Sequence, residues 1–131
     1  MGTWNSFEEI EAWQMARIFC QDIDKIINKP GLKTNYSLKD QIDRSSGSIM
    51  DNIAEGFERG GNKEFSFFLG IAKGSAGESR SQLYRIFDKG FISEEEFKVL
   101  KEKVLNISGK IANLIKYLNS TSIKGTRYKG R

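Results

Sequence analysis

The residue types that most often do acid–base, metal or nucleophilic chemistry are nearly missing from this sequence. It contains no histidine, which is both the commonest general base and the commonest metal ligand. Cys20 is the single cysteine, so no intramolecular disulfide forms and no thiolate zinc site can be built. Its position on an apolar helix face predicts a buried structural thiol rather than a nucleophile.

A phosphate-binding loop is the next chemistry to consider, because residues 70–75 read Gly-Ile-Ala-Lys-Gly-Ser. The glycine, lysine and serine stand in the wrong order for such a loop, and the segment is expected inside a helix rather than after a strand. Carboxylates are numerous, but most fall on helix faces that should be solvated. The sequence therefore predicts a protein that is not an enzyme, with no catalytic residue, metal or cofactor.

Glycines at helical spacing are the most unusual pattern. Gly70, Gly74 and Gly77 form one row of an expected helix, Ser81 continues it, and Phe67 lies near it. At 100° per residue, the row points about 150° away from the apolar face of that helix. Each interior glycine costs on the order of 1 kcal/mol relative to alanine. The row therefore predicts a close contact, either with a second subunit or with the preceding helix of the same chain.

A polar set accompanies the apolar face of the preceding expected helix. Its members are Arg44, Ser48, Asn52, Glu55 and Arg59. Such residues can form a binding surface, but more often they cap, pair with or cross-link neighbouring helices, and that interpretation is favoured. The two arginines remain candidate nucleic-acid contacts.

Positive charge gathers at the end of the chain. The net charge is +4 and the isoelectric point is near 9.2, yet residues 1–119 carry 17 basic and 17 acidic side chains. The excess falls in residues 120–131, whose serine, threonine, glycine and basic composition predicts a disordered tail. The basic residues of this tail are Lys124, Arg127, Lys129 and Arg131. They are candidate nucleic-acid contacts, or they only aid solubility.

Apolar residues recur every three or four positions in four segments, which predicts four helices. The first should begin at a capping box of Ser6 and Glu9 and end at Pro30-Gly31, followed by a loop over 31–36. The second should begin at Ser37.

Glycines mark most of the remaining boundaries. Gly60-Gly61 should end the second helix, Asn62 should cap the third, and Gly90 should end it in the left-handed conformation. Ser93 and Glu96 should form a capping box for the fourth helix. The predicted core positions are Ile10, Trp13, Ala16, Cys20, Ile23 and Ile27 in the first helix; Leu38, Ile42, Ser45, Ile49, Ile53 and Gly56 in the second; Phe65, Leu69, Ala72, Ala76, Leu83 and Ile86 in the third; and Phe97, Leu100, Val104, Ile107, Ile111, Leu114 and Leu118 in the fourth.

These segments predict an all-α protein, an antiparallel up-down-up-down four-helix bundle over residues 1–119. No apolar run approaches the roughly 20 residues that span a bilayer, and no leader is evident. A cytoplasmic protein without membrane association is therefore expected.

The second expected helix carries a distinctive run, Ser48-Ile49-x-x-Asn52-Ile53-Ala54-Glu55-Gly56, preceded by Gln41-Ile42-Asp43-Arg44 and followed by Arg59. It resembles the signature of a bacterial four-helix-bundle family that includes proteins encoded by intervening sequences of 23S rRNA genes. Phe65, Phe68-Leu69, Gly74-Ser75 and Gln82-Leu83 also fit, and the resemblance covers nearly all of residues 1–118.

The resemblance implies a bundle that assembles into a ring, typically of five subunits. A similar bundle is the accessory protein of diversity-generating retroelements, where a basic pentamer associates with reverse transcriptase and nucleic acid. This chain departs from that pattern because its body is neutral. The leading hypothesis is a non-catalytic, ring-forming scaffold or accessory protein that associates with RNA or an RNA-handling enzyme. The alternative is a protein-interaction adaptor with no nucleic-acid role.

Overall fold

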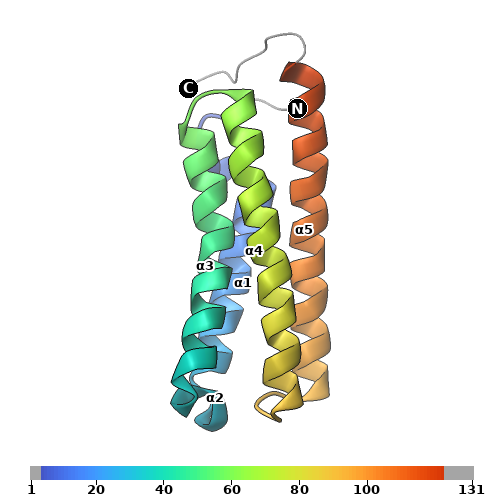
Figure 1. Cartoon of the computed structure of the whole chain (residues 1–131). Coiled ribbons are helices and arrows are strands. Elements are labelled where there is room, and N and C mark those ends of the chain that lie inside the picture. The colour runs from blue at the N-terminus through green and yellow to red at the C-terminus, as the bar shows by residue number, and fades with distance from the viewer. Residues whose placement is uncertain (1–3, 123–131) are drawn as a thin grey trace.

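The computed structural model describes residues 4–122, and these contain helices and no strand (Figure 1). The elements are the 3-10 helix η1 (Phe7–Glu9) and the α-helices α1 (Glu11–Ile27), α2 (Pro30–Thr34), α3 (Tyr36–Glu58), α4 (Asn62–Asp88) and α5 (Glu94–Ser122). The four long helices run antiparallel to their sequence neighbours. The predicted all-α, antiparallel four-helix bundle is confirmed.

Each long helix packs against two others. Helix α3 contacts α1 and α4, α4 also contacts α5, and a less extensive seam between α1 and α5 closes the bundle. The start of η1 and the end of α5 lie at the same end of the molecule (Figure 1). None of the described helices is long and apolar enough to cross a membrane.

The core positions predicted for α3 and α4 are all buried, and so are those of α5 except Leu114, which is half-buried. In α1 the prediction was partly wrong. Trp13, Cys20 and Ile27 are only half-buried, whereas the α1 residues Ala12, Phe19 and Ile26, which were not predicted, are buried. The predicted and the observed buried sets of α1 share Ala16 and Ile23. A spacing of three and four residues fits either set, so the spacing alone did not distinguish them.

The predicted start of the first helix was wrong. The side chain of Ser6 makes no capping hydrogen bond, and Glu9 accepts one from the backbone N–H of Asn5 instead, at 3.1 Å. Ile10 follows in an extended conformation and is 2% exposed. The extended, buried Ile10 therefore separates the 3-10 helix η1 from α1, which starts at Glu11.

The connection from α1 to α3 is a helical corner rather than the predicted loop. Pro30 begins α2, where the missing N–H has no helical partner to lose. Leu32 is fully buried under this corner. Asn35, not Ser37, caps α3, because its side-chain oxygen accepts the N–H of Leu38 at 3.2 Å.

The boundaries of α4 agree only in part with the predictions. Gly60 has φ 96° and follows α3, as expected of a residue that ends a helix. The cap of α4 is Gly61, and Asn62 is instead the first helical residue, where its side-chain N–H donates to Thr121 Oγ1 at 2.9 Å. Gly90 adopts the predicted left-handed conformation, with φ 77°.

The capping box before α5 is confirmed. The N–H of Ser93 donates to Glu96 Oε1 at 2.9 Å, and the N–H of Glu96 donates to Ser93 Oγ at 3.1 Å. The first of these bonds, together with Lys29 at 3.0 Å, lowers the pKa of Glu96. Helix α5 continues through Ser122, three residues past the predicted boundary, and the predicted tail contacts Lys124, Arg127, Lys129 and Arg131 lie outside the described residues.

Ile107 offers a test of the core. It is 1% exposed, so replacement with Ala should lower the free energy of unfolding by about 2–5 kcal/mol. Leu105 on the same helix is 40% exposed, and Leu105→Ala should cost less than about 1 kcal/mol. Urea denaturation measures both values, and equal losses would contradict the register of α5.

Candidate interaction surface on helices α3 and α4

Hydroxyl groups line the contact between α3 and α4. Ser45 Oγ lies 2.7 Å from Ser79 Oγ and donates to Gln82 Oε1 at 2.6 Å, and all three side chains are buried. One turn away, Ser48 Oγ lies 2.8 Å from Ser75 Oγ. These small side chains let the two helices approach closely while each hydroxyl keeps a hydrogen-bond partner.

The polar set of α3 bonds partly within that helix and partly across to α4. The Asn52 side chain donates to the carbonyl and the hydroxyl of Ser48, both at 2.9 Å. Arg59 pairs with Glu55 at 2.8 Å, and its guanidinium lies 4.9 Å from the centre of the Phe68 ring on α4. Asn52 and Glu55 thus bond within α3, whereas Ser48 and Arg59 also reach α4. These contacts agree with the favoured interpretation for four of the five residues, and Arg44 is the exception.

The rest of the distinctive run packs the helix pair. Ile49 and Ile53 are fully buried, and Ala54 is half-buried. Gly56 lies directly against α4, where an added Cβ would come within 2.7 Å of the Phe68 Cβ. The run thus combines a glycine at a close helix contact with polar groups that bond along the seam.

Residues 8–113 match the 23S rRNA-intervening sequence protein family. The chain belongs to this family. A crystal structure from Bacteroides thetaiotaomicron, of a protein with unknown function from the S23 ribosomal protein family, is similar with a TM-score of 0.74. It is 22% identical and covers 80% of this chain and 98% of its own, so the likeness concerns the fold. A search of curated proteins finds no match.

In this family member the glycine row lies on the open surface of α4. Gly70, Gly74 and Gly77 are exposed, and a Cβ added at any of them would meet no atom within 4 Å. Packing against the preceding helix, one of the two interpretations left open by the sequence, is therefore wrong. The neighbouring side chains Phe67 and Ile71 are 65% and 40% exposed, and Ser81 is exposed as well.

An open depression of about 560 Å³ lies along the outer side of α3. Its lining consists of Asp43, Arg44, Gly47, Ser48, Asp51, Asn52 and Glu55. Three carboxylates surround the one guanidinium, which disfavours phosphate at Arg44. The other predicted arginine contact, Arg59, lies 15 residues along the chain, about 22 Å at 1.5 Å per helical residue. The two arginines therefore do not form one basic patch.

Sequence reasoning missed the α4 side of the seam, namely Ser75, Ser79 and Gln82. Their spacing of four and three residues is the signal that could have identified them, because it matches the spacing of a helix face. In a sequence, a row of polar residues at this spacing usually indicates a solvent-exposed helix face. Here they are buried because α3 presents its own hydroxyls opposite them.

The rest of the described residues offer few groups for metal binding or nucleophilic chemistry. No group of three Cys, Asp or Glu side chains within residues 4–122 could hold a metal ion. The predicted burial of Cys20 is only partial, and its thiol donates to the carbonyl of Ser46 at 3.2 Å. Burial raises the pKa of the Cys20 thiol from 9.0 to about 11, with smaller contributions from nearby carboxylates, so the thiol is neutral at physiological pH.

The raised pKa predicts slow alkylation of Cys20. At pH 8 the thiolate fraction of the folded protein should be about a hundredfold below that of the urea-unfolded chain, since the pKa differs by two units. Iodoacetamide should therefore react about a hundredfold more slowly with the folded protein. The stability contributed by the neutral thiol is present below pH 9 and declines as the pH rises towards 11. Equal alkylation rates would contradict this.

Proposed function

We propose that this protein is a non-catalytic scaffold whose copies assemble into a ring through the exposed face of α4. One observation carries the proposal. Gly70, Gly74 and Gly77 follow one another on a solvent-facing strip, with the apolar side chains Phe67 and Ile71 beside them. Nothing within the described chain covers this strip.

The strip has the features of a helix contact. Three glycines cost α4 roughly 3 kcal/mol relative to alanine, taking about 1 kcal/mol for each, with no compensating contact in the described chain. A backbone from another copy can approach such a strip closely, and burial of Phe67 and Ile71 then contributes about 25 cal/mol per Å². A contact that joins unlike faces of successive copies closes into a ring when its rotation completes a full circle, and otherwise forms an open filament. The family resemblance favours five copies.

RNA, or an RNA-handling enzyme such as a reverse transcriptase, is the proposed partner class. The positive charge for RNA would come from residues 123–131, because the rest of the chain is neutral. A ring would present several such segments together, and avidity could then raise affinity by about two decades or more. The acidic depression on α3 supports the second candidate, an adaptor for a protein partner, since its carboxylates repel phosphate.

The assembly proposal predicts the effect of a bulky residue in the glycine row. Gly74→Leu should keep its helical content but give a smaller species in light scattering, because leucine prevents close approach at the strip. Gly109→Leu on α5 is the matched control, since that glycine is also exposed with open space around it. It should leave the size unchanged.

Two other results would contradict the assembly proposal. Normal assembly by the Gly74→Leu variant would remove the strip from the contact between copies. An equal loss of assembly in both variants would mean that leucine acts through something other than the strip.

The RNA proposal predicts that truncation after Ser122 abolishes most non-specific affinity. A single tail makes at most four phosphate contacts, so it should give a slope of log affinity against log salt no steeper than about −3 for single-stranded RNA. Several tails of a ring that bind one RNA together should give a steeper slope. Filter binding at two salt concentrations measures this. Equal affinity of the full and truncated chains would contradict a role for the basic residues, and no binding by either would favour the adaptor.

A further inference from the structure

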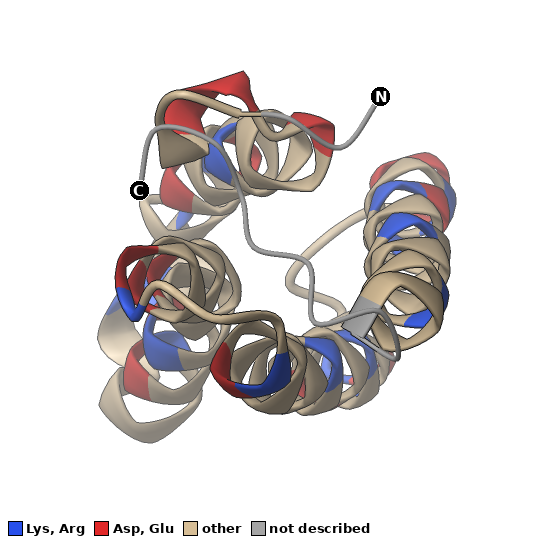
Figure 2. Cartoon of the chain, turned by 90° about the horizontal axis from the view of Figure 1, so that it is seen from above, with Lys and Arg blue, Asp and Glu red and all other residues tan. Residues whose placement is uncertain are grey.

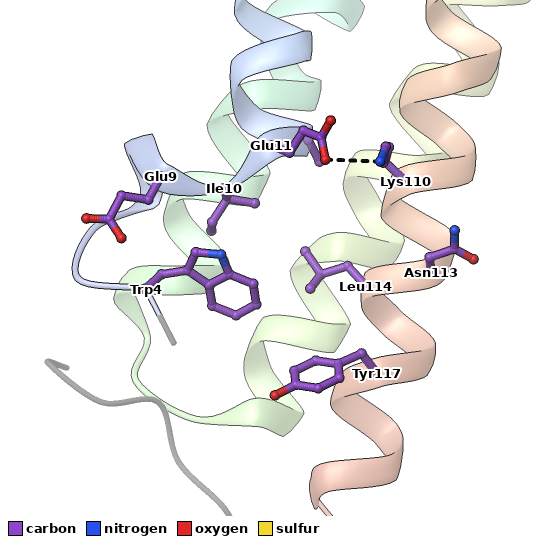
Figure 3. Close-up of a pocket in the computed structure, with 9 residues that line it drawn as sticks. Trp4, Glu9, Ile10, Glu11, Lys110, Asn113, Leu114 and Tyr117 are labelled. Carbon is purple, nitrogen blue, oxygen red and sulfur yellow. Dashed lines mark hydrogen bonds and ion pairs between the residues drawn. The ribbon is translucent and has the colours of Figure 1, made fainter. Parts of the chain in front are cut away.

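A cavity of about 350 Å³ opens between the start of α1 and the last turns of α5 (Figure 3). It lies on the side of the bundle away from the α3–α4 surface. Its lining consists of Trp4, Glu9, Ile10, Glu11, Ala12, Lys110, Asn113, Leu114 and Tyr117. We call it the α1–α5 cavity.

The inner part of the α1–α5 cavity is apolar and aromatic. Trp4 holds its place by edge-to-face contacts with Phe65 and Tyr117, with ring centres 6.4 Å apart in each pair. In Figure 3 the side chains of Trp4, Leu114 and Tyr117 point into the space between the two helices. Such walls suit an aromatic or aliphatic side chain, while the volume admits little more than a few residues.

The rim of the α1–α5 cavity is acidic. Glu11 pairs with Lys110 at 3.0 Å, which leaves Glu9 as the one unbalanced charge of the lining. Its carboxylate accepts the N–H of Asn5 at 3.1 Å and lies on the outer side of Trp4 (Figure 3), and Glu8 is its neighbour in the chain. Both are exposed, and the view from this end shows acidic positions on η1 and at the start of α1 (Figure 2). The cavity is therefore complementary to a segment with an apolar side chain flanked by positive charges.

We propose that the α1–α5 cavity binds residues 123–131 of this chain. That segment contains Tyr128 and four basic side chains, and it contains no acid. Its composition matches both the aromatic walls and the acidic rim. Tyr128 stands between Arg127 and Lys129, so an aromatic side chain in the cavity would bring positive charge to the rim.

The distances allow this docking. Tyr117, on the cavity wall, lies five residues before Ser122, where α5 ends, which is about 7.5 Å along the helix. Lys110 lies about 18 Å back from Ser122 by the same rise. Nine residues in extended conformation span up to about 30 Å, so the segment can turn back and cover the whole cavity.

Docking would regulate access to the same charges that are proposed to bind RNA. Residues held at the acidic rim are shielded from phosphate, so RNA and the cavity compete for them. The docking itself does not require RNA binding, and its test contains no RNA. Failure of one proposal therefore leaves the other standing.

The test adds a synthetic peptide with the sequence of residues 123–131 to two proteins, the full chain and a chain that ends at Ser122. The indole N–H resonance of Trp4 reports binding in nuclear magnetic resonance spectra, and a Trp13→Phe variant distinguishes it from the other indole. The shorter chain should bind the peptide. The full chain should bind it at least about tenfold more weakly, because its own segment competes at an effective concentration of mM order.

Two substitutions test the cavity itself. In the shorter chain, Glu9→Lys should weaken peptide binding at least about threefold by reversing charge at the rim. Glu102→Lys is the matched control on an exposed site of α5 outside the cavity lining, and it should change affinity less than twofold. A peptide with Tyr128→Ser should bind more weakly than the native sequence, because it lacks the aromatic side chain.

Three results would overturn the proposal. The first is no shift of the Trp4 resonance in the shorter chain at mM peptide. The second is equal peptide affinity of the full and shorter chains, which would leave the cavity open to a different cationic partner. The third is an equal effect of Glu9→Lys and Glu102→Lys, which would reduce the interaction to net charge.

Discussion

The close approach of α3 and α4 is the constraint on which the rest of the bundle depends. It requires small groups on both helices. The buried hydroxyls of Ser45 and Ser79 meet that requirement because they bond to each other, and Ser45 also bonds to Gln82. A buried hydroxyl without a partner costs about 1–3 kcal/mol, so loss of one partner affects the others. Gly56 extends the same contact to the end of α3, where the Phe68 Cβ leaves no room for a side chain.

The opposite side of the molecule is built differently. The seam between α1 and α5 is less extensive, and ion pairs bridge it at Glu11–Lys110 and Asp22–Lys103. Partly exposed pairs of this kind contribute at most about 1 kcal/mol each. The bundle therefore has one tightly packed side and one side with room for a cavity. The run from Ser48 to Gly56 lies on the tight side, where serine and asparagine bond along the seam and glycine allows close contact.

The sequence predicts an element well when its own apolar spacing determines which face is buried. It predicts poorly where contacts with distant segments decide. The faces of α3, α4 and α5 follow from apolar spacing alone, because each has one clear stripe. In α1 two stripes overlap, and the contacts of the helix with α3, α5 and η1 decide between them. Trp13, on the predicted stripe, packs on Phe7 with ring centres 5.1 Å apart and stays half-buried. The α2 corner depends on Leu32, whose burial is a tertiary effect. The α1–α5 cavity arises between distant segments, so no local pattern reveals it. The spacing of Ser75, Ser79 and Gln82 places them on one helix face, but only the hydroxyls of α3 opposite them explain why that face is buried.

Both described ends of the chain lie at the same end of the bundle, and for a ring this has a geometric consequence. Cyclic symmetry places every copy of a given atom in one plane perpendicular to the axis. If the bundles stand along the axis of the proposed ring, residues 4 and 122 of every copy would lie towards one face and all α2 corners towards the other. Such a ring has two chemically different rims, so it can bind one partner on one rim while the other rim faces away.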